Sequence, residues 1–304
     1  MKIGIAGAGA VGCHYGSFLQ QAGCDVTYFA RGDHLASLQH CGLVHLSNGE
    51  ETVLDVHASD DASILSDCDV ILLTCKTTVL SELCEQLESV IEDQVVLVTV
   101  QNGVAAPDQV AAFFPNNPLI TATAFIGVRI EKPGVVVHSA AGHIRLGVCQ
   151  NEGELLLSAL TGLIAAWKRS GVDAEHVSDM KCMLWHKMAW NCGFNAITAL
   201  TRRYARDIAA DEDSVRWVRA AMQEVVEVAA AESVELPDGA IEQHLALTMK
   251  AGPVKTSMWQ DMEHGRPTEI AAMNGYIVKR AGELGLIVPT NDLLASLIRA
   301  SERK

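Results

Sequence analysis

The hydrophobic pattern of the chain changes character near its middle. In the first half, apolar runs such as "KIGIAG", "DVILLTCK" and "QVVLVTVQNG" have the length of buried strands and alternate with segments of helical periodicity. Such alternation predicts a mainly parallel sheet wrapped by helices. From about Asn151 the strand pattern fades and helical periodicity replaces it. We therefore predict an α/β doubly wound domain over residues 1–175, followed by an all-helical domain over residues 176–304.

The same pattern predicts individual elements. In the first half we expect a helix through about Gln21, a short helix with Asp33 as its N-cap, a β-hairpin turning at Asn48-Gly49, and a helix over residues 78–92. "LITATAFIGV", "GVVVHSA" and "HIRLGV" are predicted as three further strands. The helices predicted for the second half cover residues 154–170, 178–200, 212–232, 239–250, 267–284 and 291–302. The junction of the two domains is where we expect a substrate cleft.

Composition excludes several classes of protein. The 304 residues are 49% apolar and 20% charged, which is typical of a globular protein, and the net charge of −14 argues against nucleic acid or an anionic membrane as partner. No apolar run reaches the roughly 20 residues that span a bilayer, and no signal pattern precedes the first motif. The nine cysteines include no CxxC pair and no zinc spacing. We expect a cytoplasmic protein without a metal site.

A glycine-rich turn follows the first predicted strand. Gly7-Ala8-Gly9-Ala10-Val11-Gly12 is a G-x-G-x-x-G pattern that also opens a helix. The first glycine allows a tight turn, the second lets the backbone approach a pyrophosphate, and the third lets helix and strand pack closely. The alternative is an ordinary glycine-rich turn. The context favours dinucleotide binding in a Rossmann-type domain.

Two residues that follow predicted strands of the first half indicate whether the dinucleotide is NAD or NADP. An NAD site carries Asp or Glu at the end of its second strand, but this strand ends "TYFARG". Arg31 stands just beyond that position, and Lys76 emerges at the same edge of the sheet. Each alone is equally well explained as a solvated surface base. Together with the absent acid, they favour NADP (NADPH) as cofactor.

A polar stripe runs along the predicted helix "LWHKMAWNCGFNAITAL". Lys187, Asn191 and Asn195 are spaced by four residues, so they lie within about 80° of one another around the helix. A solvated face rarely carries two Asn, which are poor helix formers. The stripe is either the wall of a polar pocket or a pair of satisfied buried amides.

Three further residues are candidates for the same pocket. Asn102, in "TVQNGV", ends a strand at the sheet edge where ligands of doubly wound folds bind. Ser257 precedes one helix, and Glu269 lies in the first turn of the next. Because Pro267-Thr268-Glu269 is also how a helix begins, local pattern alone favours a structural role for Glu269.

Taken together, these stretches resemble the ketopantoate reductases (2-dehydropantoate 2-reductases). The resemblance covers essentially the whole chain and is carried by "GAGAVG", Arg31, Lys76, "QNGV", "LWHKMAWNCGFNAITAL" and "SMWQDMEHGRPTEI" with the later "AGELGLIVPTND". It implies a Rossmann domain followed by a helical domain. It also implies reduction of a 2-oxo acid to a 2-hydroxy acid with NADPH, on the pantothenate pathway.

The resemblance also implies a role for each candidate. Lys187 would be the catalytic lysine, and Glu269 an active-site carboxylate that touches substrate and cofactor. Asn102 would lie beside the nicotinamide and the substrate, and Arg31 and Lys76 on the adenosine phosphate. The substrate would be bound by Asn191, Asn195 and Ser257. This chemistry is reasonable, because a lysine ammonium stabilises the charge that hydride transfer builds on a keto oxygen and can deliver the proton.

Two departures from the family pattern bear on the substrate. Ala271-Ala272 stands where the family usually has Asp after Glu-Ile, and the loop "TRRYARDIAAD" carries Arg202, Arg203 and Arg206. The loop is either solvated or a different grip on the substrate carboxylate. Another 2-oxo or 3-hydroxy acid dehydrogenase remains an alternative function. A non-catalytic NADP-sensing protein is a second, against which Lys187 and Glu269 argue. The helical domain could bury a homodimer interface, although burial within one chain explains its apolar helices equally well.

Overall fold

The structure is a computed structural model that describes residues 1–47, 49–253 and 255–303. The chain divides into two compact units. The first consists of Met1–Gln101 with Ala105–Met180, and the second of Asn102–Val104 with Lys181–Lys304. A three-residue segment that follows a strand of the first unit therefore belongs to the second unit. Within the described residues, no helix has the length and apolar character needed to cross a membrane.

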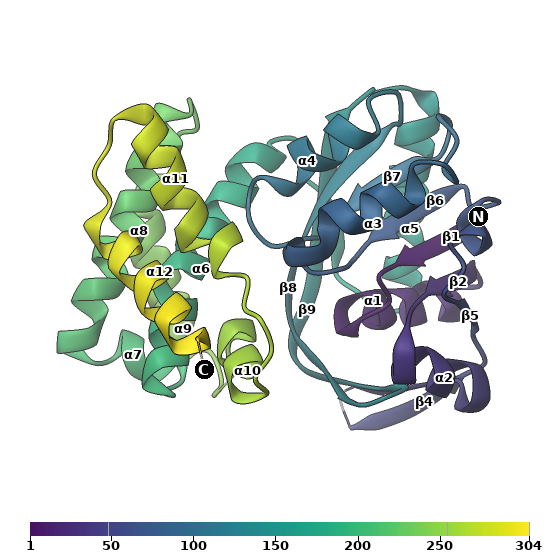
Figure 1. The fold of residues 1–304 in the computed structure, drawn as a ribbon, viewed down its shortest axis with the longest axis horizontal. Helices are drawn as coiled ribbons and strands as arrows, with labels where there is room; N and C mark the ends of the chain where they lie inside the picture. The colour runs from purple at the N-terminus through teal and green to yellow at the C-terminus, as the bar shows by residue number, and fades with distance from the viewer. Residues whose placement is uncertain (48, 254, 304) are drawn as a thin grey trace. The chain divides into compact units, whose positions relative to one another are not determined.

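The first unit contains one ten-stranded sheet, in the order β4-β3-β9-β8-β7-β6-β1-β2-β5 with β10 beside β9 (Figure 1). Its strands are β1 (Lys2–Ala6), β2 (Asp25–Phe29), β3 (Leu43–Ser47), β4 (Glu50–Leu54), β5 (His57–Ser59), β6 (Val70–Leu73), β7 (Val96–Thr99), β8 (Leu119–Lys132), β9 (Val135–Gln150) and β10 (Ala174–His176). The run from β8 through β7, β6, β1 and β2 to β5 is parallel, whereas β3–β4 and β8–β9 are antiparallel. The mainly parallel sheet was predicted correctly.

Helices cover both faces of this sheet, because the side chains of the central strands alternate between two apolar cores. Ile71 and Leu73 of β6 lie in one core, and Val70 and Leu72 lie in the other. The helices of this unit are α1 (Ala10–Gln21), α2 (Gly32–Cys41), α3 (Leu80–Leu87), α4 (Ala106–Phe113) and α5 (Glu154–Arg169). The doubly wound prediction is confirmed.

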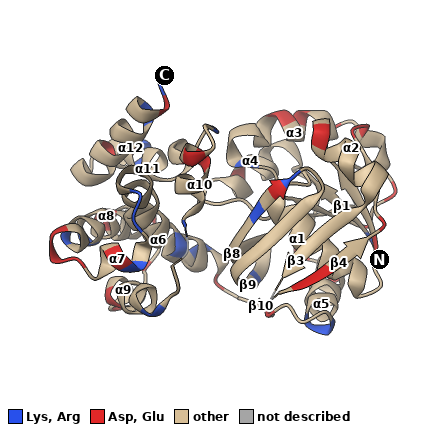
Figure 2. Ribbon diagram, turned by 90° about the horizontal axis from the view of Figure 1, so that it is seen from below, with Lys and Arg blue, Asp and Glu red and all other residues tan. Residues whose placement is uncertain are grey.

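The core that contains Ile71 is covered by α3 and α4. Leu80, Leu83 and Leu87 of α3 are buried in it, at the helical spacing that places them on one side of the helix. The acidic residues of α3 are exposed to solvent (Figure 2).

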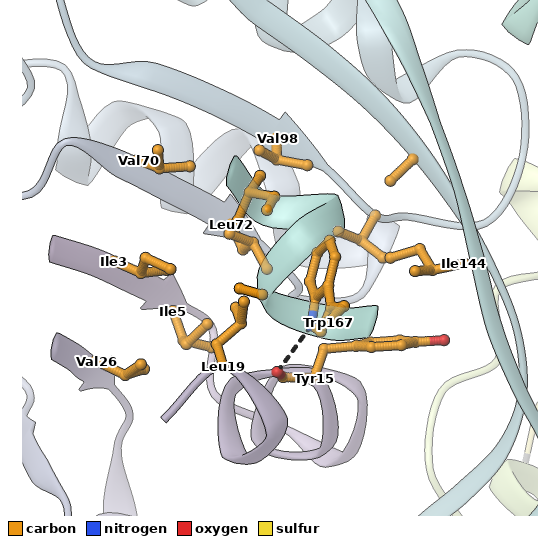
Figure 3. Packing of buried hydrophobic residues seen from close by; sticks show 14 of the residues in the cluster. Ile3, Ile5, Tyr15, Leu19, Val26, Val70, Leu72, Val98, Ile144 and Trp167 are labelled. Carbon is orange, nitrogen blue, oxygen red and sulfur yellow. Dashed lines mark hydrogen bonds between the residues drawn. The ribbon is translucent and has the colours of Figure 1, made fainter. Parts of the chain in front are cut away.

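The opposite core lies between the sheet, α1 and α5. Ile3 and Ile5 of β1 pack there with Leu19 of α1 and with Trp167 of α5, which is fully buried (Figure 3). The indole Nε1–H of Trp167 donates a hydrogen bond to the carbonyl of Tyr15 over 3.1 Å. A buried indole nitrogen needs such a partner, and this bond links α5 to α1.

Three local predictions for the first unit were wrong. The helix α2 begins at Gly32 with Arg31 as its N-cap, so Asp33 lies in the first turn and does not cap the helix. The helix predicted over 78–92 is a 3₁₀ turn (Thr77–Val79) followed by α3, which ends at Leu87.

The third error concerns the last two predicted strands, "GVVVHSA" and "HIRLGV", which form the single strand β9. Ala141 and Gly142 both have positive φ at a register shift in the pairing with β8, so the strand bulges there and continues. The predicted hairpin of β3 and β4 is antiparallel as expected. At its turn, Asn48 lies outside the described residues.

The second unit is helical around α6 (Met180–Thr201). Residues 191–199 of α6 are all buried, as expected for a helix inside an apolar core. The helix α8 contacts α7, α9, α11 and α12. The remaining helices are α7 (Ala205–Ala209), α8 (Glu212–Ala231), α9 (Ala240–Lys250), α10 (Ser257–Glu263), α11 (Asn274–Leu284) and α12 (Pro289–Glu302).

The helix predicted over 267–284 is broken. A 3₁₀ turn (Ile270–Ala272) comes first, and Met273, with φ −111° and ψ −109°, separates it from α11. Glu269 therefore precedes the 3₁₀ turn. Our prediction that it lies in the first turn of an α-helix was wrong. The helix expected after Ser257 is α10, which begins at Ser257 itself. The helices α7 and, in the first unit, α4 were not predicted.

Candidate active site

The glycine turn between β1 and α1 has the geometry that each glycine was predicted to allow. Gly7 has φ +79°, and a Cβ there would lie 2.8 Å from the backbone nitrogen of Cys75. A Cβ on Gly12 would lie 2.7 Å from Ile5, so this glycine permits close packing of helix on strand. At Gly9, by contrast, the nearest atom to such a Cβ is 3.8 Å away, which leaves open space before the first turn of α1. Such a cradle fits a pyrophosphate.

This open space belongs to a cavity of about 560 Å³ in the first unit. Gly7, Ala8 and Gly9 line it, together with Arg31 and Lys76. Ala10, Val11 and Gly12 form the start of α1. Arg31 follows β2 and Lys76 follows β6, and the carboxyl ends of these parallel strands lie at the same edge of the sheet. The residues present fit a dinucleotide whose phosphates meet α1.

Sequence reasoning missed further polar side chains of this cavity, among them His34, Asp60 and Glu82. Glu82 forms an ion pair with Arg31, at 3.7 Å between Oε1 and a guanidinium nitrogen. The pattern carried no signal for these residues, because α2, α3 and the loop after β5 come together only in the folded sheet.

In the second unit, three of the predicted residues form one hydrogen-bonded group. Lys187 Nζ donates to Asn102 Oδ1 over 3.0 Å, and Asn102 Nδ2 donates to Glu269 Oε2 over 3.1 Å. Glu269 is 8% exposed. The amide of Asn102 thus bridges a cation and a carboxylate that lie far apart in sequence.

Gly103 explains how Asn102 reaches this position. Gly103 has φ +93°, and a Cβ there would lie 2.8 Å from the carbonyl oxygen of Ala272. The segment after β7 can therefore approach the 3₁₀ turn that follows Glu269 only with glycine next to Asn102.

The ammonium of Lys187 has a perturbed acidity. Burial lowers the pKa of Lys187 to about 8, while the negative charge of Glu269 acts in the opposite direction. The lysine is therefore mainly protonated at pH 7 and close to the point at which it can give up its proton. A pKa in this range suits a general acid.

The two asparagines of the stripe lie beside each other on α6. Asn195 Nδ2 donates to Asn191 Oδ1 over 3.5 Å and to Met273 Sδ over 3.2 Å. Both residues are buried, at 4% and 2% exposure. Within the described residues, Asn191 Nδ2 and Asn195 Oδ1 have no hydrogen-bond partner. Buried polar atoms normally have one, so a donor and an acceptor remain for a ligand.

Ser257 is not joined to this group. It is the first residue of α10 and is exposed. Its neighbour Thr256 caps α10 and lies 2.7 Å, between hydroxyl oxygens, from Thr198 on α6. The structure thus brings the start of α10 to α6 without a hydrogen bond between Ser257 and the described residues of the stripe.

Behind the stripe lies a buried polar network that the sequence did not reveal. Asn274 Nδ2 donates to the carbonyl of Cys192 on α6 (3.0 Å) and to Asn291 Oδ1 (2.9 Å). The buried carboxylate of Glu224 accepts from the backbone N–H groups of Thr290 and Asn291, each over 2.8 Å. It thereby satisfies free N–H groups at the start of α12. The sequence pattern did not indicate this network, because Asn274 lay inside the helix predicted over 267–284.

Two arginines of the loop after α6 form ion pairs with acidic residues of the same segment. Arg203 donates to Asp211 over 2.8 Å, and Arg206 pairs with Asp207 at 3.3 Å. Asp211 also caps α8. These contacts favour the solvated, structural interpretation of the loop.

Comparison with known proteins identifies the family. The family described as Ketopantoate reductase PanE/ApbA matches residues 3–151, and the one described as Ketopantoate reductase PanE/ApbA C terminal matches residues 179–302. The 2-dehydropantoate 2-reductase of Mesorhizobium japonicum is 31% identical, over 98% of this chain and 97% of that protein.

Solved structures agree. A ketopantoate reductase of this family from Ralstonia eutropha superposes with a TM-score of 0.91 at 29% identity, covering 99% of this chain and 98% of that one. The D-mandelate dehydrogenase described in a ternary structure with NADH and anilino(oxo)acetate superposes with a TM-score of 0.90 at 25% identity, with the same coverage. These similarities imply a nicotinamide cofactor. The chain is an oxidoreductase and belongs to the ketopantoate reductase family.

Proposed function

We propose that this chain reduces a 2-oxo acid to the corresponding 2-hydroxy acid with NADPH, and that ketopantoate is its substrate. The product, pantoate, would then enter pantothenate biosynthesis. The observation that carries the proposal is the group of Lys187, Asn102 and Glu269, in which a lysine of lowered pKa is held by hydrogen bonds. Family membership and relatives named 2-dehydropantoate 2-reductase support the substrate.

Lys187 is the proposed general acid. The nicotinamide supplies the hydride when it is bound, and negative charge develops on the keto oxygen of the substrate. The ammonium of Lys187 stabilises that charge and donates the proton that completes the alcohol. Asn102 holds the ammonium through its carbonyl oxygen. Glu269 accepts from the other end of the same amide, which restricts the rotation of Asn102.

Asn191 and Asn195 are the proposed substrate ligands. Among the described residues, Asn191 Nδ2 and Asn195 Oδ1 have no partner, so the first can donate to a carboxylate or carbonyl and the second can accept from a hydroxyl. A 2-oxo acid that carries a hydroxyl group, such as ketopantoate, offers both kinds of group. Ser257, exposed at the start of α10, is proposed as a further substrate ligand.

The preference for NADPH rests on two cations. Arg31 and Lys76 both line the cavity at the glycine turn, and the second strand ends without an acid. A guanidinium and an ammonium suit a 2′-phosphate, which NADH lacks. Asn102 and Glu269 are also proposed to contact the cofactor.

A second candidate substrate is a 2-oxo acid with a different side chain. The similarity to D-mandelate dehydrogenase is nearly as high as that to the ketopantoate reductase from Ralstonia eutropha. In addition, Ala271 is exposed where the family usually has Asp, two positions after Glu269. The residues that carry hydride transfer are the same in both cases.

A panel of 2-oxo acids, including ketopantoate and phenylglyoxylate, tests the proposal when oxidation of NADPH and of NADH is followed. We expect the highest kcat/KM with ketopantoate and NADPH. A higher kcat/KM with phenylglyoxylate would show that ketopantoate is not the preferred substrate. A higher kcat/KM with NADH would show that NADPH is not the preferred cofactor. Tight NADPH binding without turnover of any acid would indicate an NADP-sensing protein instead.

A further inference from the structure

The cavity at the glycine turn contains acids as well as cations. Arg31 and Lys76 line it, but so do Asp60 and Glu82. Glu82 lies in the first turn of α3, where the helix dipole favours an acid, and Figure 2 shows the acidic residues of this helix. One cavity thus contains the side chains that favour a 2′-phosphate and those that favour a free ribose hydroxyl.

Arg31 and Glu82 interact directly. The guanidinium lies 3.7 Å from Glu82 Oε1, and the two side chains are 75% and 58% exposed. An ion pair this exposed is weak, so a ligand can exchange for either partner at little cost. The same carboxylate oxygen also accepts from Gln86 Nε2 over 3.5 Å.

We propose that Glu82 is a specificity-determining residue that weakens the discrimination of NADPH against NADH. A 2′-phosphate that binds Arg31 must compete with the carboxylate of Glu82 and is repelled by it. A 2′-hydroxyl can instead donate a hydrogen bond to that carboxylate. The inference rests on the proposed NADPH preference and adds the residue that limits it.

Binding of 2′,5′-ADP and of 5′-AMP tests the inference without turnover, because the two differ only by the 2′-phosphate. Isothermal titration calorimetry on the full chain gives the ratio of their affinities. In Glu82→Gln we expect the preference for 2′,5′-ADP to rise roughly three- to tenfold over that of the wild type, the scale of one or two exposed charge interactions. Glu85→Gln removes the same charge from an exposed position of α3 that does not line the cavity, and it should leave the ratio unchanged.

A ratio that rises less than threefold in Glu82→Gln, or that rises equally in Glu85→Gln, overturns the inference. The proposed NADPH preference is tested separately, by the affinities of the wild type alone. If the wild type binds 5′-AMP as tightly as 2′,5′-ADP, the proposed NADPH preference fails. The change in ratio caused by Glu82→Gln still decides the role of Glu82.

Discussion

Lys187 Nζ donates a hydrogen bond to Oδ1 of Asn102 over 3.0 Å, although 85 positions separate the two residues. The other end of that amide donates to Glu269, so one side chain fixes the geometry between a cation and an acid. An amide can do this because it has both a donor and an acceptor and carries no charge of its own. The amide therefore orients the lysine without neutralising its charge.

Replacement of Lys187 by alanine tests its role as general acid. We expect kcat to fall about 10²- to 10⁴-fold, the usual contribution of general acid catalysis. Dinucleotide binding should persist, because the cavity residues of the first unit are unchanged. Lys181→Ala, an exposed lysine of the same helix, is the control and should retain full activity. Activity of Lys187→Ala within tenfold of the wild type would contradict the assignment.

The pH dependence of the reaction follows from the pKa of Lys187. A general acid must be protonated, so kcat/KM for reduction should be constant below pH 8 and fall as the pH rises through about 8. Because the charge of Glu269 raises the pKa of Lys187, Glu269→Gln should move this fall to lower pH. Profiles of kcat/KM against pH for the wild type and for Glu269→Gln measure this shift. Glu263→Gln, at an exposed position, is the control. A shift to higher pH in Glu269→Gln would show that the two side chains do not interact as described.

Local periodicity was enough to predict most of the fold and one part of the site. Strand and helix lengths follow from apolar spacing, and four-residue spacing placed Lys187, Asn191 and Asn195 on one side of α6. The single strand β9 was divided in two because a bulge looks like a turn in sequence.

The remainder of the site depends on tertiary contacts. Glu269 looked like a helix start, but the backbone breaks at Met273, Gly103 lies close to Ala272, and the carboxylate of Glu269 accepts from Asn102. The link between Asn274 and α6 was equally invisible, because the predicted helix over 267–284 placed Asn274 in its interior and periodicity does not report a tertiary hydrogen bond. No pattern in one sequence reports which distant loop a side chain meets.

Alanine at Asn191 should mainly weaken substrate binding, whereas alanine at Asn274 should mainly lower stability. Asn191 accepts one long hydrogen bond, at 3.5 Å from Asn195, and its Nδ2 has no partner among the described residues, so Asn191→Ala should cost about 1 kcal/mol of unfolding free energy. Its KM for the 2-oxo acid should rise roughly 10- to 100-fold if the amide binds a carboxylate. Asn274→Ala leaves Asn291 Oδ1 without its donor and should cost about 1–3 kcal/mol. Urea unfolding and steady-state kinetics measure both, and a stable Asn274→Ala with raised KM would reverse the two roles.

Acid should destabilise the first unit through buried histidines. His14 Nδ1 lies 3.0 Å from His45 Nε2, and the ring of His138 lies 4.6 Å from that of His14. Burial, with a smaller effect of His138, lowers the pKa of His45 to about 4. The unfolded chain therefore binds a proton below about pH 6.5 that the folded chain binds only below about 4, so stability falls as the pH falls through this window.

Between pH 6.5 and 5, His45 alone should cost roughly 2 kcal/mol of unfolding free energy. Urea unfolding at several pH values should show a smaller pH slope in His45→Gln than in the wild type. The exposed His57→Gln serves as the control and should keep the wild-type slope. Equal slopes in all three proteins would place the acid sensitivity elsewhere.

Alanine at Gly9 should weaken cofactor binding, whereas alanine at Gly12 should lower stability, although both glycines belong to one motif. A Cβ on Gly12 meets Ile5 at 2.7 Å and also crowds Thr74, so Gly12→Ala should lower the free energy of unfolding by about 1–3 kcal/mol. At Gly9, φ is −86° and a Cβ meets nothing nearer than 3.8 Å, so Gly9→Ala should fold normally. It should nevertheless bind NADPH at least about tenfold more weakly, because the methyl group occupies the space left for the pyrophosphate. Fluorescence titration with NADPH and urea unfolding separate the two effects, and a Gly9→Ala protein with wild-type NADPH affinity would show that the phosphates bind elsewhere.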